Sequence, residues 1–196
     1  MSDVLVLYYS VNGATESLAR EVCTGVDSVA GMESRLRTVP KVSTTVEVVE
    51  DDVPESGPPY ANPDDLSECS GLVMGSPTRF GNMAAALKYF LDGTATEWLS
   101  GSAAGKPAGL FTSTSSLHGG QESTLLTMAI PLLHHGMLIV GLPYTEEAIN
   151  ETTTGGTPYG ASHVTWNRKA DSLSDHERHL ARALGRRVAE IAKKLG

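Results

Sequence analysis

The chain has 196 residues, of which 40% are hydrophobic and 19% are charged, so it can bury a core and its length suits one domain, residues 1–196. Its 15 Lys and Arg residues against 23 Asp and Glu residues give a net charge of −8, which disfavours sequence-independent binding to nucleic acid or to an anionic membrane. Two cysteines, Cys23 and Cys69, make neither a disulfide framework nor a zinc-site spacing. Because the sequence has no signal-peptide pattern and no apolar stretch of about 20 residues, we expect a cytoplasmic protein.

Short apolar runs predict the strands of a parallel sheet, because a strand that is covered on both faces is apolar throughout. The predicted strands are residues 4–9, 46–49, 71–75, 108–111 and 137–140. Apolar residues at helical spacing follow three of them, at residues 18–26, 83–91 and 121–134. Asn82 is a candidate cap for the second of these helices, and a capping box at residues 174–177 begins a last helix. The alternation predicts an α/β fold with a doubly wound, five-stranded parallel sheet and helices on both faces.

Two further segments are predicted to be loops. Residues 50–62 are acidic and proline-rich, and residues 146–171 are rich in Gly, Thr and Pro, which indicates a long structured loop. Four aspartates form two acidic pairs in or beside the first segment: Asp51, Asp52, Asp64 and Asp65. We interpret these pairs as surface charge rather than as metal ligands.

A short loop between the first strand and the first helix is the first candidate binding segment. It consists of Ser10, Val11, Asn12, Gly13, Ala14 and Thr15. Hydroxyls at both ends, a flexible glycine and free N–H groups at a helix N-terminus favour the binding of a phosphate. Because the loop lacks the G-x-G-x-x-G pattern and the lysine of a P-loop, a terminal monophosphate fits better than a nucleoside triphosphate. The same residues also fit a capped helix start that binds no ligand.

Two other loops follow strands and carry polar or aromatic residues. Pro77, Thr78, Arg79 and Phe80 follow the third strand, and Ser113, Thr114, Ser115, Ser116, Leu117, His118 and Gly119 end and follow the fourth. The first loop suits an aromatic ring with polar edges, unless Phe80 packs in the core and Arg79 is solvated. The N–H groups of the second loop can surround the edge of such a ring, although the loop can also be an ordinary surface loop. In open parallel sheets ligands bind beyond the carboxyl ends of strands, so we expect the three loops to meet at one site.

Several segments together resemble a known family. They are Ser10-x-Asn-Gly-x-Thr15, Gly-Ser-Pro-Thr-Arg-Phe-Gly-Asn-Met at residues 75–83, His-His-Gly-Met at 134–137 and Gly-Gly-Thr-Pro-Tyr-Gly at 155–160. Between about residue 4 and residue 160 the chain resembles the WrbA family of flavodoxin-like NAD(P)H:quinone oxidoreductases. The resemblance implies a flavodoxin-like fold, FMN as cofactor, NADH or NADPH as electron donor, a quinone as acceptor, and a homotetramer whose subunits complete the site.

The same resemblance implies roles for single residues. The FMN phosphate would lie on residues 10–15 and its ring between residues 77–80 and 113–119, with His134 beside the flavin as the catalytic side chain. Phe80 and Trp98 would be the aromatic walls of the substrate slot, and Asn12, which replaces an aromatic residue often found in the family, would contact the nicotinamide. From the residues alone, His134 can instead cap helix carbonyls, and Trp98 can be a core or subunit-contact residue.

The function that these features favour is a two-electron, ping-pong reduction of quinones to hydroquinones by NAD(P)H. One slot would serve the donor and the quinone in turn. Two alternatives share the fold: a one-electron flavodoxin-type carrier, and an FMN-containing binding or scaffold protein. A phosphate-accepting receiver domain is disfavoured, because Ser10 and Ser76 stand at the strand ends where clustered aspartates would be required.

Overall fold

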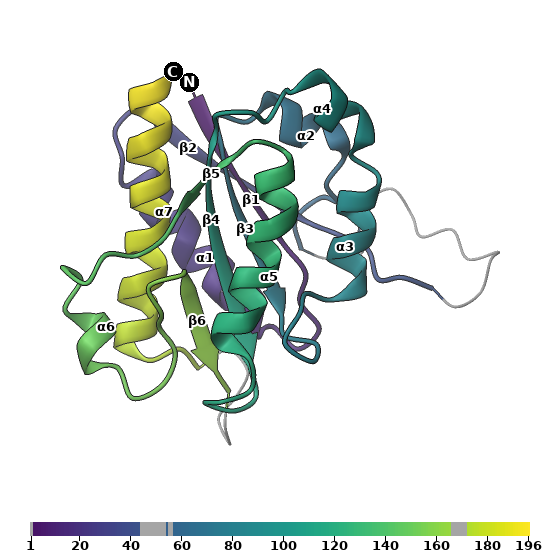
Figure 1. The fold of residues 1–196 in the computed structure, drawn as a ribbon. Helices are drawn as coiled ribbons and strands as arrows, with labels where there is room; N and C mark the ends of the chain where they lie inside the picture. The colour runs from purple at the N-terminus through teal and green to yellow at the C-terminus, as the bar shows by residue number, and fades with distance from the viewer. Residues whose placement is uncertain (1, 44–53, 55–56, 166–171) are drawn as a thin grey trace.

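The computed structural model describes residues 2–43, 54, 57–165 and 172–196. Its strands are β1 (Ser2–Tyr8), β2 (Met32–Thr38), β3 (Gly71–Pro77), β4 (Pro107–Thr114), β5 (Leu138–Val140) and β6 (Ala161–Val164). Its helices are α1 (Ala14–Asp27), α2 (Pro63–Glu68), α3 (Ala85–Asp92), α4 (Ala95–Ser100), α5 (Gln121–His134), α6 (Ala148–Glu151) and α7 (Asp175–Leu195). The strands form one parallel sheet in the order β2-β1-β3-β4-β5, and helices cover both of its faces (Figure 1). The predicted α/β fold is confirmed.

The fifth position of the sheet is shared by two strands. β5 pairs with the beginning of β4, where Leu138 lies opposite Pro107, and β6 pairs with its end, where Val164 lies opposite Thr114. The segment between them contains α6. The prediction of a loop throughout residues 146–171 was therefore wrong for α6 and β6. β6 has only four residues of mixed polarity, and it is a strand because β4 extends beyond β5 and offers it a partner.

The second strand also differs from the prediction. The predicted strand at residues 46–49 lies outside the described residues, and the structure places β2 at Met32–Thr38. β2 lies at the edge of the sheet and is mostly half-buried, so charged residues are tolerated along it. Arg35 of β2 pairs with Asp3 of β1 and with Glu68 of α2. Without a continuous apolar run, this strand gave no signal in the sequence.

Asp65 corrects the interpretation of the acidic pairs as surface charge, whereas Asp64 is exposed as expected, and Asp51 and Asp52 lie outside the described residues. Its side chain is only 4% exposed, and its carboxylate accepts hydrogen bonds from the Asn62 backbone N–H and from Arg35 Nη1. Arg37 Nε lies 3.3 Å from the same carboxylate. The Asn62 side chain accepts a hydrogen bond from the Asp65 N–H, and the two bonds form a capping box at the start of α2. Asp65 therefore joins α2 to the edge strand.

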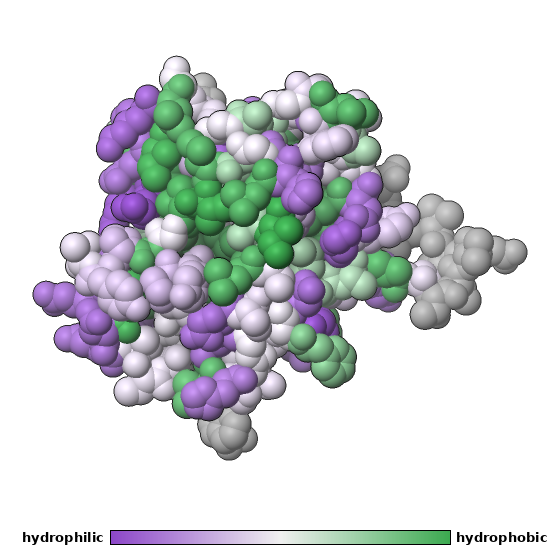
Figure 2. Space-filling view, in the orientation of Figure 1, coloured by the Kyte–Doolittle hydropathy of each residue, from purple (hydrophilic) through white to green (hydrophobic). Residues whose placement is uncertain are grey.

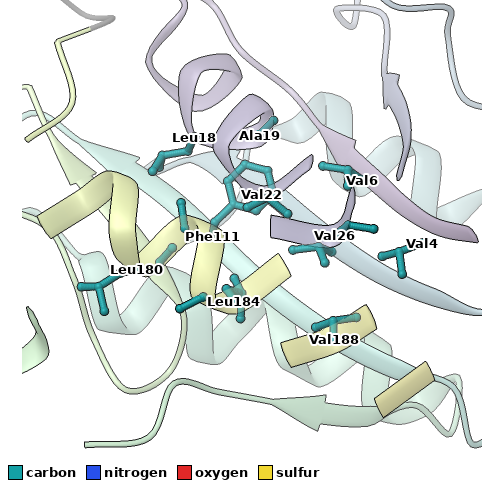
Figure 3. Packing of buried hydrophobic residues seen from close by; sticks show 14 of the residues in the cluster. Val4, Val6, Leu18, Ala19, Val22, Val26, Phe111, Leu180, Leu184 and Val188 are labelled. Atoms are coloured by element: carbon teal, nitrogen blue, oxygen red, sulfur yellow. The ribbon is translucent and has the colours of Figure 1, made fainter. Parts of the chain in front are cut away.

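Two apolar cores lie on the two faces of the sheet. One core lies between the sheet and helices α1 and α7, and Figure 3 shows Phe111 of β4 in it beside Val22 of α1. Gly75 gives Phe111 its space, because a Cβ on Gly75 would lie 2.0 Å from the Phe111 ring. α1 and α7 approach closely through Gly25 and Gly185, where a Cβ would lie about 2 Å from a backbone oxygen of the other helix. The second core lies under α2, α3 and α5.

Glu177 is a buried carboxylate that ties α7 to the end of the sheet. It is the last residue of the predicted capping box, which is confirmed, and its Oε2 accepts from the Ser174 N–H at 2.7 Å. The same oxygen lies 3.0 Å from His163 Nδ1 of β6, while Oε1 accepts from the N–H groups of Gly155 and Val164. Burial by itself raises the pKa of this carboxyl, but the hydrogen bonds from His163 and the backbone outweigh it and lower the pKa to about 2.

We therefore predict that Glu177 makes the free energy of unfolding depend on pH. Because its pKa is depressed in the folded chain, its contribution is complete above the ordinary value of 4.5 and is lost as the pH falls towards 2. Glu177→Gln should lower the free energy of unfolding by about 3 kcal/mol at pH 7 and flatten its dependence on pH below 5. Urea titrations at pH 7 and pH 3 measure both effects. Glu190→Gln, an exposed change on the same helix, is the control and should alter neither.

Candidate functional site at the carboxyl ends of the strands

The three predicted loops converge on one cavity of about 330 Å³ beyond the ends of β1, β3 and β4. Its walls are formed by Ser10, Val11, Asn12, Ala14, Thr15, Pro77, Thr78, Arg79, Ser113, Thr114, Ser115 and Thr165. Of these, Thr165, which follows β6, was not singled out from the sequence. The cavity arises because parallel strands all end at one edge of the sheet, which Figure 1 shows at the lower side of the molecule.

The start of α1 supplies hydrogen-bond donors to this cavity. Gly13 stands at the N-cap position with φ +83°, a left-handed conformation that glycine adopts without strain, and no side chain caps the helix. The N–H groups of the first helical residues therefore have no acceptor within the helix. The Ser10 hydroxyl is buried and has no hydrogen-bond partner in the described part of the chain. These neutral donors fit the phosphate of FMN.

Thr15, a candidate phosphate ligand, also connects the loop after β1 to the end of β4. Its side chain is 1% exposed, and its Oγ1 lies 2.8 Å from Ser113 Oγ at the end of β4. Thr78, after β3, joins the same arrangement, because its N–H donates to the Ser113 carbonyl oxygen at 2.9 Å. These contacts connect all three loops and fix the width of the cavity.

The loop after β3 is a tight turn that leaves an aromatic side chain in solvent. Arg79 and Asn82 exchange two backbone hydrogen bonds, with Phe80 at φ 53° and Gly81 at φ 77° between them, which is a type I′ turn. Phe80 is fully exposed, so the alternative that it packs in the core is wrong. Asn82 was predicted to cap the next helix, and this is also wrong: its side chain accepts from the Met83 N–H, while α3 has Ala84 at its N-cap.

Two residues of α5 that the sequence analysis missed hold the candidate loops, Gln121 the loop after β4 and Thr124 the loop after β3. Gln121 Nε2 donates to the Leu117 carbonyl oxygen, and Thr124 Oγ1 donates to Thr78 Oγ1, each at 2.8 Å. Both lie in the first turn of α5, which faces the loops. This position in the sequence was the signal from which their contact with the site could have been predicted. No acceptor in the described chain takes the N–H groups of residues 116–118, so they remain available to a ligand. Residues 116–119 border the cavity without lining it.

His134 and Trp98 lie at the opposite edge of the sheet. α5 starts beside the cavity and runs antiparallel to the strands for 14 residues, which is about 20 Å at 1.5 Å per residue. It ends where β5 and β4 begin, as Figure 1 shows. Trp98 of α4 donates from Nε1 to the His134 carbonyl oxygen at 2.8 Å. Within one chain, the structure does not bring these two predicted site residues to the cavity.

These two residues line a second hollow, of about 440 Å³, between α3, α4 and α5. The Trp98 side chain is 51% exposed, so it is not a core residue, and the His134 side chain makes no hydrogen bond within the described chain. The neighbouring His135 has a structural role: its Nε2 lies 3.0 Å from Thr94 Oγ1 at the start of α4, and burial lowers its pKa. His134 therefore presents a free imidazole at the surface.

The sheet order β2-β1-β3-β4-β5, with the cavity beyond the strand ends, defines a flavodoxin-like fold, and comparison with solved structures agrees. A flavodoxin, WrbA-like protein from Agrobacterium tumefaciens superposes with a TM-score of 0.69 at 22% identity, over 99% of both chains. The apo form of an NADH:FMN oxidoreductase, EmoB, superposes with a TM-score of 0.65 at 15% identity, over 100% of this chain and 91% of that one.

The family model described as NADPH-dependent FMN reductase matches residues 3–146, and the chain belongs to this family. It is 43% identical, over 98% of each chain, to a protein from Syntrophobacter fumaroxidans that is named NAD(P)H dehydrogenase (quinone). A protein of the same name from Acidithiobacillus ferrooxidans is 42% identical, over 100% of this chain and 99% of its own.

Phe80 allows a prediction about strain at the site. A non-glycine residue at φ 53° has a strained backbone. Because the Phe80 ring is exposed, no burial of apolar surface offsets the free energy of this strain. Phe80→Asn should therefore raise the free energy of unfolding of the FMN-free protein by about 0.5 kcal/mol, because asparagine tolerates this conformation better. Tyr144→Asn, at another exposed aromatic residue with ordinary φ, is the control. If Phe80→Asn has a lower free energy of unfolding than the wild-type chain in a urea titration, the claim that Phe80 is strained is wrong.

Proposed function

We propose that the chain is an FMN-dependent NAD(P)H:quinone oxidoreductase that reduces quinones to hydroquinones by two electrons. The observation that carries this proposal is the cavity at the strand ends, where an uncapped helix start and an unpartnered buried hydroxyl face one space. Full-length relatives at about 43% identity that are named for this activity support it. When bound, FMN supplies the redox chemistry by accepting two electrons from NAD(P)H and passing them to the quinone.

The chain's own residues bind the cofactor and position it. Ser10 Oγ and the N–H groups at the start of α1 bind the phosphate with neutral donors. The turn at Phe80 and the loop at residues 113–119 would hold the ring between them. The free N–H groups of residues 116–118 would donate hydrogen bonds to its polar edge, where such donors stabilise negative charge.

The donor and the quinone use one slot in turn, with Asn12 and Phe80 at its border. Asn12 lines the cavity, and Phe80 is held in solvent at the cavity's rim by its turn. Because both reactants must meet the same face of one flat ring, NAD⁺ or NADP⁺ has to leave before the quinone enters. This order supports a ping-pong cycle, in which double-reciprocal plots at several quinone concentrations are parallel.

The remaining catalytic groups come from a neighbouring copy of the chain in a homotetramer. Trp98 and His134 are too far from their own cavity, but they are exposed and accessible to another copy. Beside them, an apolar surface consists of Leu126, Ile130, Leu133, Leu138 and Ile139, each at least 37% exposed. Figure 2 shows a broad apolar area on the face that carries α5 and β5. In this assembly Trp98 forms a wall of the slot, and His134 hydrogen-bonds to or protonates the bound oxidant.

We place the enzyme in the reducing cytoplasm. Both cysteines are free thiols, Cys69 buried and Cys23 half-buried, and burial raises the pKa of each, which makes them poor nucleophiles. Such thiols are typical of a reducing compartment. In the described residues, no helix is both long and apolar enough to cross a bilayer.

A spectroscopic titration tests the proposed activity. The FMN-loaded protein, kept free of oxygen, should lose its flavin absorbance with one equivalent of NADH or NADPH and regain it with one equivalent of benzoquinone. Bleaching by a chemical reductant but not by either nucleotide would favour the one-electron carrier. A yellow protein that is reduced by a nucleotide but not reoxidised by quinone would contradict the proposal.

A second experiment tests the assembly. Ile130→Asp places a charge on the exposed face of α5, far from the cavity of its own chain, and should reduce the mass measured by light scattering. Quinone turnover should fall at least tenfold while FMN remains bound, because Trp98 and His134 no longer reach a neighbouring slot. Leu195→Asp, an equally exposed change at the end of α7, is the control. Full turnover by a monomer would overturn the shared site.

A further inference from the structure

A groove, distinct from the hollow at Trp98 and His134, adjoins the cavity at the strand ends. It has a volume of about 560 Å³ and lies between the start of α3, the end of β1 and the residues after β2. Its lining residues are Tyr9, Lys41, Val42, Arg79, Asn82, Met83, Ala84, Ala85, Ala86 and Lys88. Arg79 lines both this groove and the proposed flavin cavity, so the two spaces meet at its side chain.

The groove is cationic in a chain that is acidic overall. Its described lining contains Lys41, Arg79 and Lys88 and no carboxylate, whereas the whole chain has a net charge of −8. Arg79 donates from Nη1 to the Thr78 carbonyl oxygen, and its other N–H groups have no acceptor in the described chain. Lys88 pairs with Asp92, and Lys41 also has a partner within the chain. Both side chains of the Lys88–Asp92 pair are more than half exposed, so a ligand can compete for this cation.

The backbone adds to the positive potential of the groove. Ala84 is the N-cap of α3 and carries no capping side chain. Its own N–H donates to Ser76 Oγ, but the N–H groups of Ala85 and Ala86, in the first turn, have no acceptor within the helix. Tyr9 and Met83 provide apolar surface beside these donors. Cations, free N–H groups and apolar walls together suit a phosphorylated ligand with flat or sugar parts.

We propose that this groove binds the phosphate groups of the donor dinucleotide while its nicotinamide lies on the flavin. The inference rests on the proposed function, because that function requires NAD(P)H to extend beyond the flavin slot. A quinone has no phosphate, so the groove distinguishes the donor from the acceptor although both use one slot. Arg79, at the junction of the two spaces, orients the dinucleotide between them.

Kinetics of the FMN-loaded protein test this groove. The double variant with Lys41→Gln and Lys88→Gln removes two cations without altering the flavin cavity, whose lining includes neither residue. The KM for the donor should rise about tenfold, because charge attraction to phosphate is lost, while the KM for the quinone, which carries no phosphate, should change far less. Lys194→Gln, an exposed cation at the far end of α7, is the control for net charge.

The two donors identify the phosphate that is bound. An equal rise in KM for NADH and NADPH assigns the groove to the pyrophosphate, and a rise for NADPH alone assigns it to the 2′-phosphate; either result supports the proposal. Unchanged KM values for both donors would overturn it. A change in the mass of the assembly with unchanged KM values would overturn it as well, because the groove would then belong to a contact between copies.

A binding measurement separates the groove from the proposed activity. Calorimetric titration of the FMN-loaded protein with NADP⁺ and NAD⁺ needs no turnover. The double variant should bind at least one of them about tenfold more weakly than the wild-type chain and the Lys194→Gln control. If the wild-type chain fails to oxidise NAD(P)H, the proposed function fails, yet this comparison still decides whether the groove binds phosphates. Equal affinities in all three proteins would overturn the inference.

Discussion

The burial of β1, β3 and β4 on both faces is the constraint on which the rest of the molecule depends. The neighbours of these strands are parallel, and parallel strands need a crossover connection, usually a helix, to return the chain to the same end of the sheet. Every loop that follows a strand is therefore placed at one edge. The loop at residues 10–15, the Phe80 turn and the loop at residues 113–119 meet there for this reason, although they are far apart in the sequence.

The polar contacts at this edge give the cavity a fixed shape. Ser113 contacts both Thr15 and Thr78, which connects the three loops, and Thr124 supports Thr78 from α5. The side chains involved are neutral, so an acidic chain can still provide an anion site through helix N–H groups and hydroxyls. The cationic side chains of Lys41 and Lys88 instead line the neighbouring groove, and Arg79 lines both this groove and the cavity. In the proposed function, this division would separate the binding of a cofactor phosphate from the attraction of a charged donor.

The length of α5 has a consequence for the proposed chemistry. A helix of this length carries its last residues across the whole sheet, so His134 cannot serve the cavity from which its own helix starts. The same helix exposes an apolar face that continues onto the edge strand β5. A second copy that covers this face would bury apolar surface and bring free aromatic and imidazole groups near a cavity. Assembly and catalysis are thus coupled in the proposed function.

The sequence by itself determined the elements whose signal is local. The apolar runs of β1, β3 and β4 and the capping box at Ser174 fixed their elements, and the loops after the strands fixed the candidate site. β2 and β6 were missed because each is a strand only by pairing with a neighbour, β2 at a charged edge and β6 along the free end of β4. Pairing of this kind depends on contacts between distant residues, which no local pattern records.

Tertiary structure alone decided the buried polar contacts and the placement of the remaining site residues. The Glu177–His163 pair, the Arg35–Asp65 pair and the Thr124–Thr78 hydrogen bond each join segments that are separate in the sequence. A sequence motif singled out His134. The motif does not show that α5 runs away from the cavity and so places His134 at the opposite end of the sheet. Local sequence fixes short-range geometry through hydrogen bonds and sterics, whereas distance across the molecule is set by how whole elements pack.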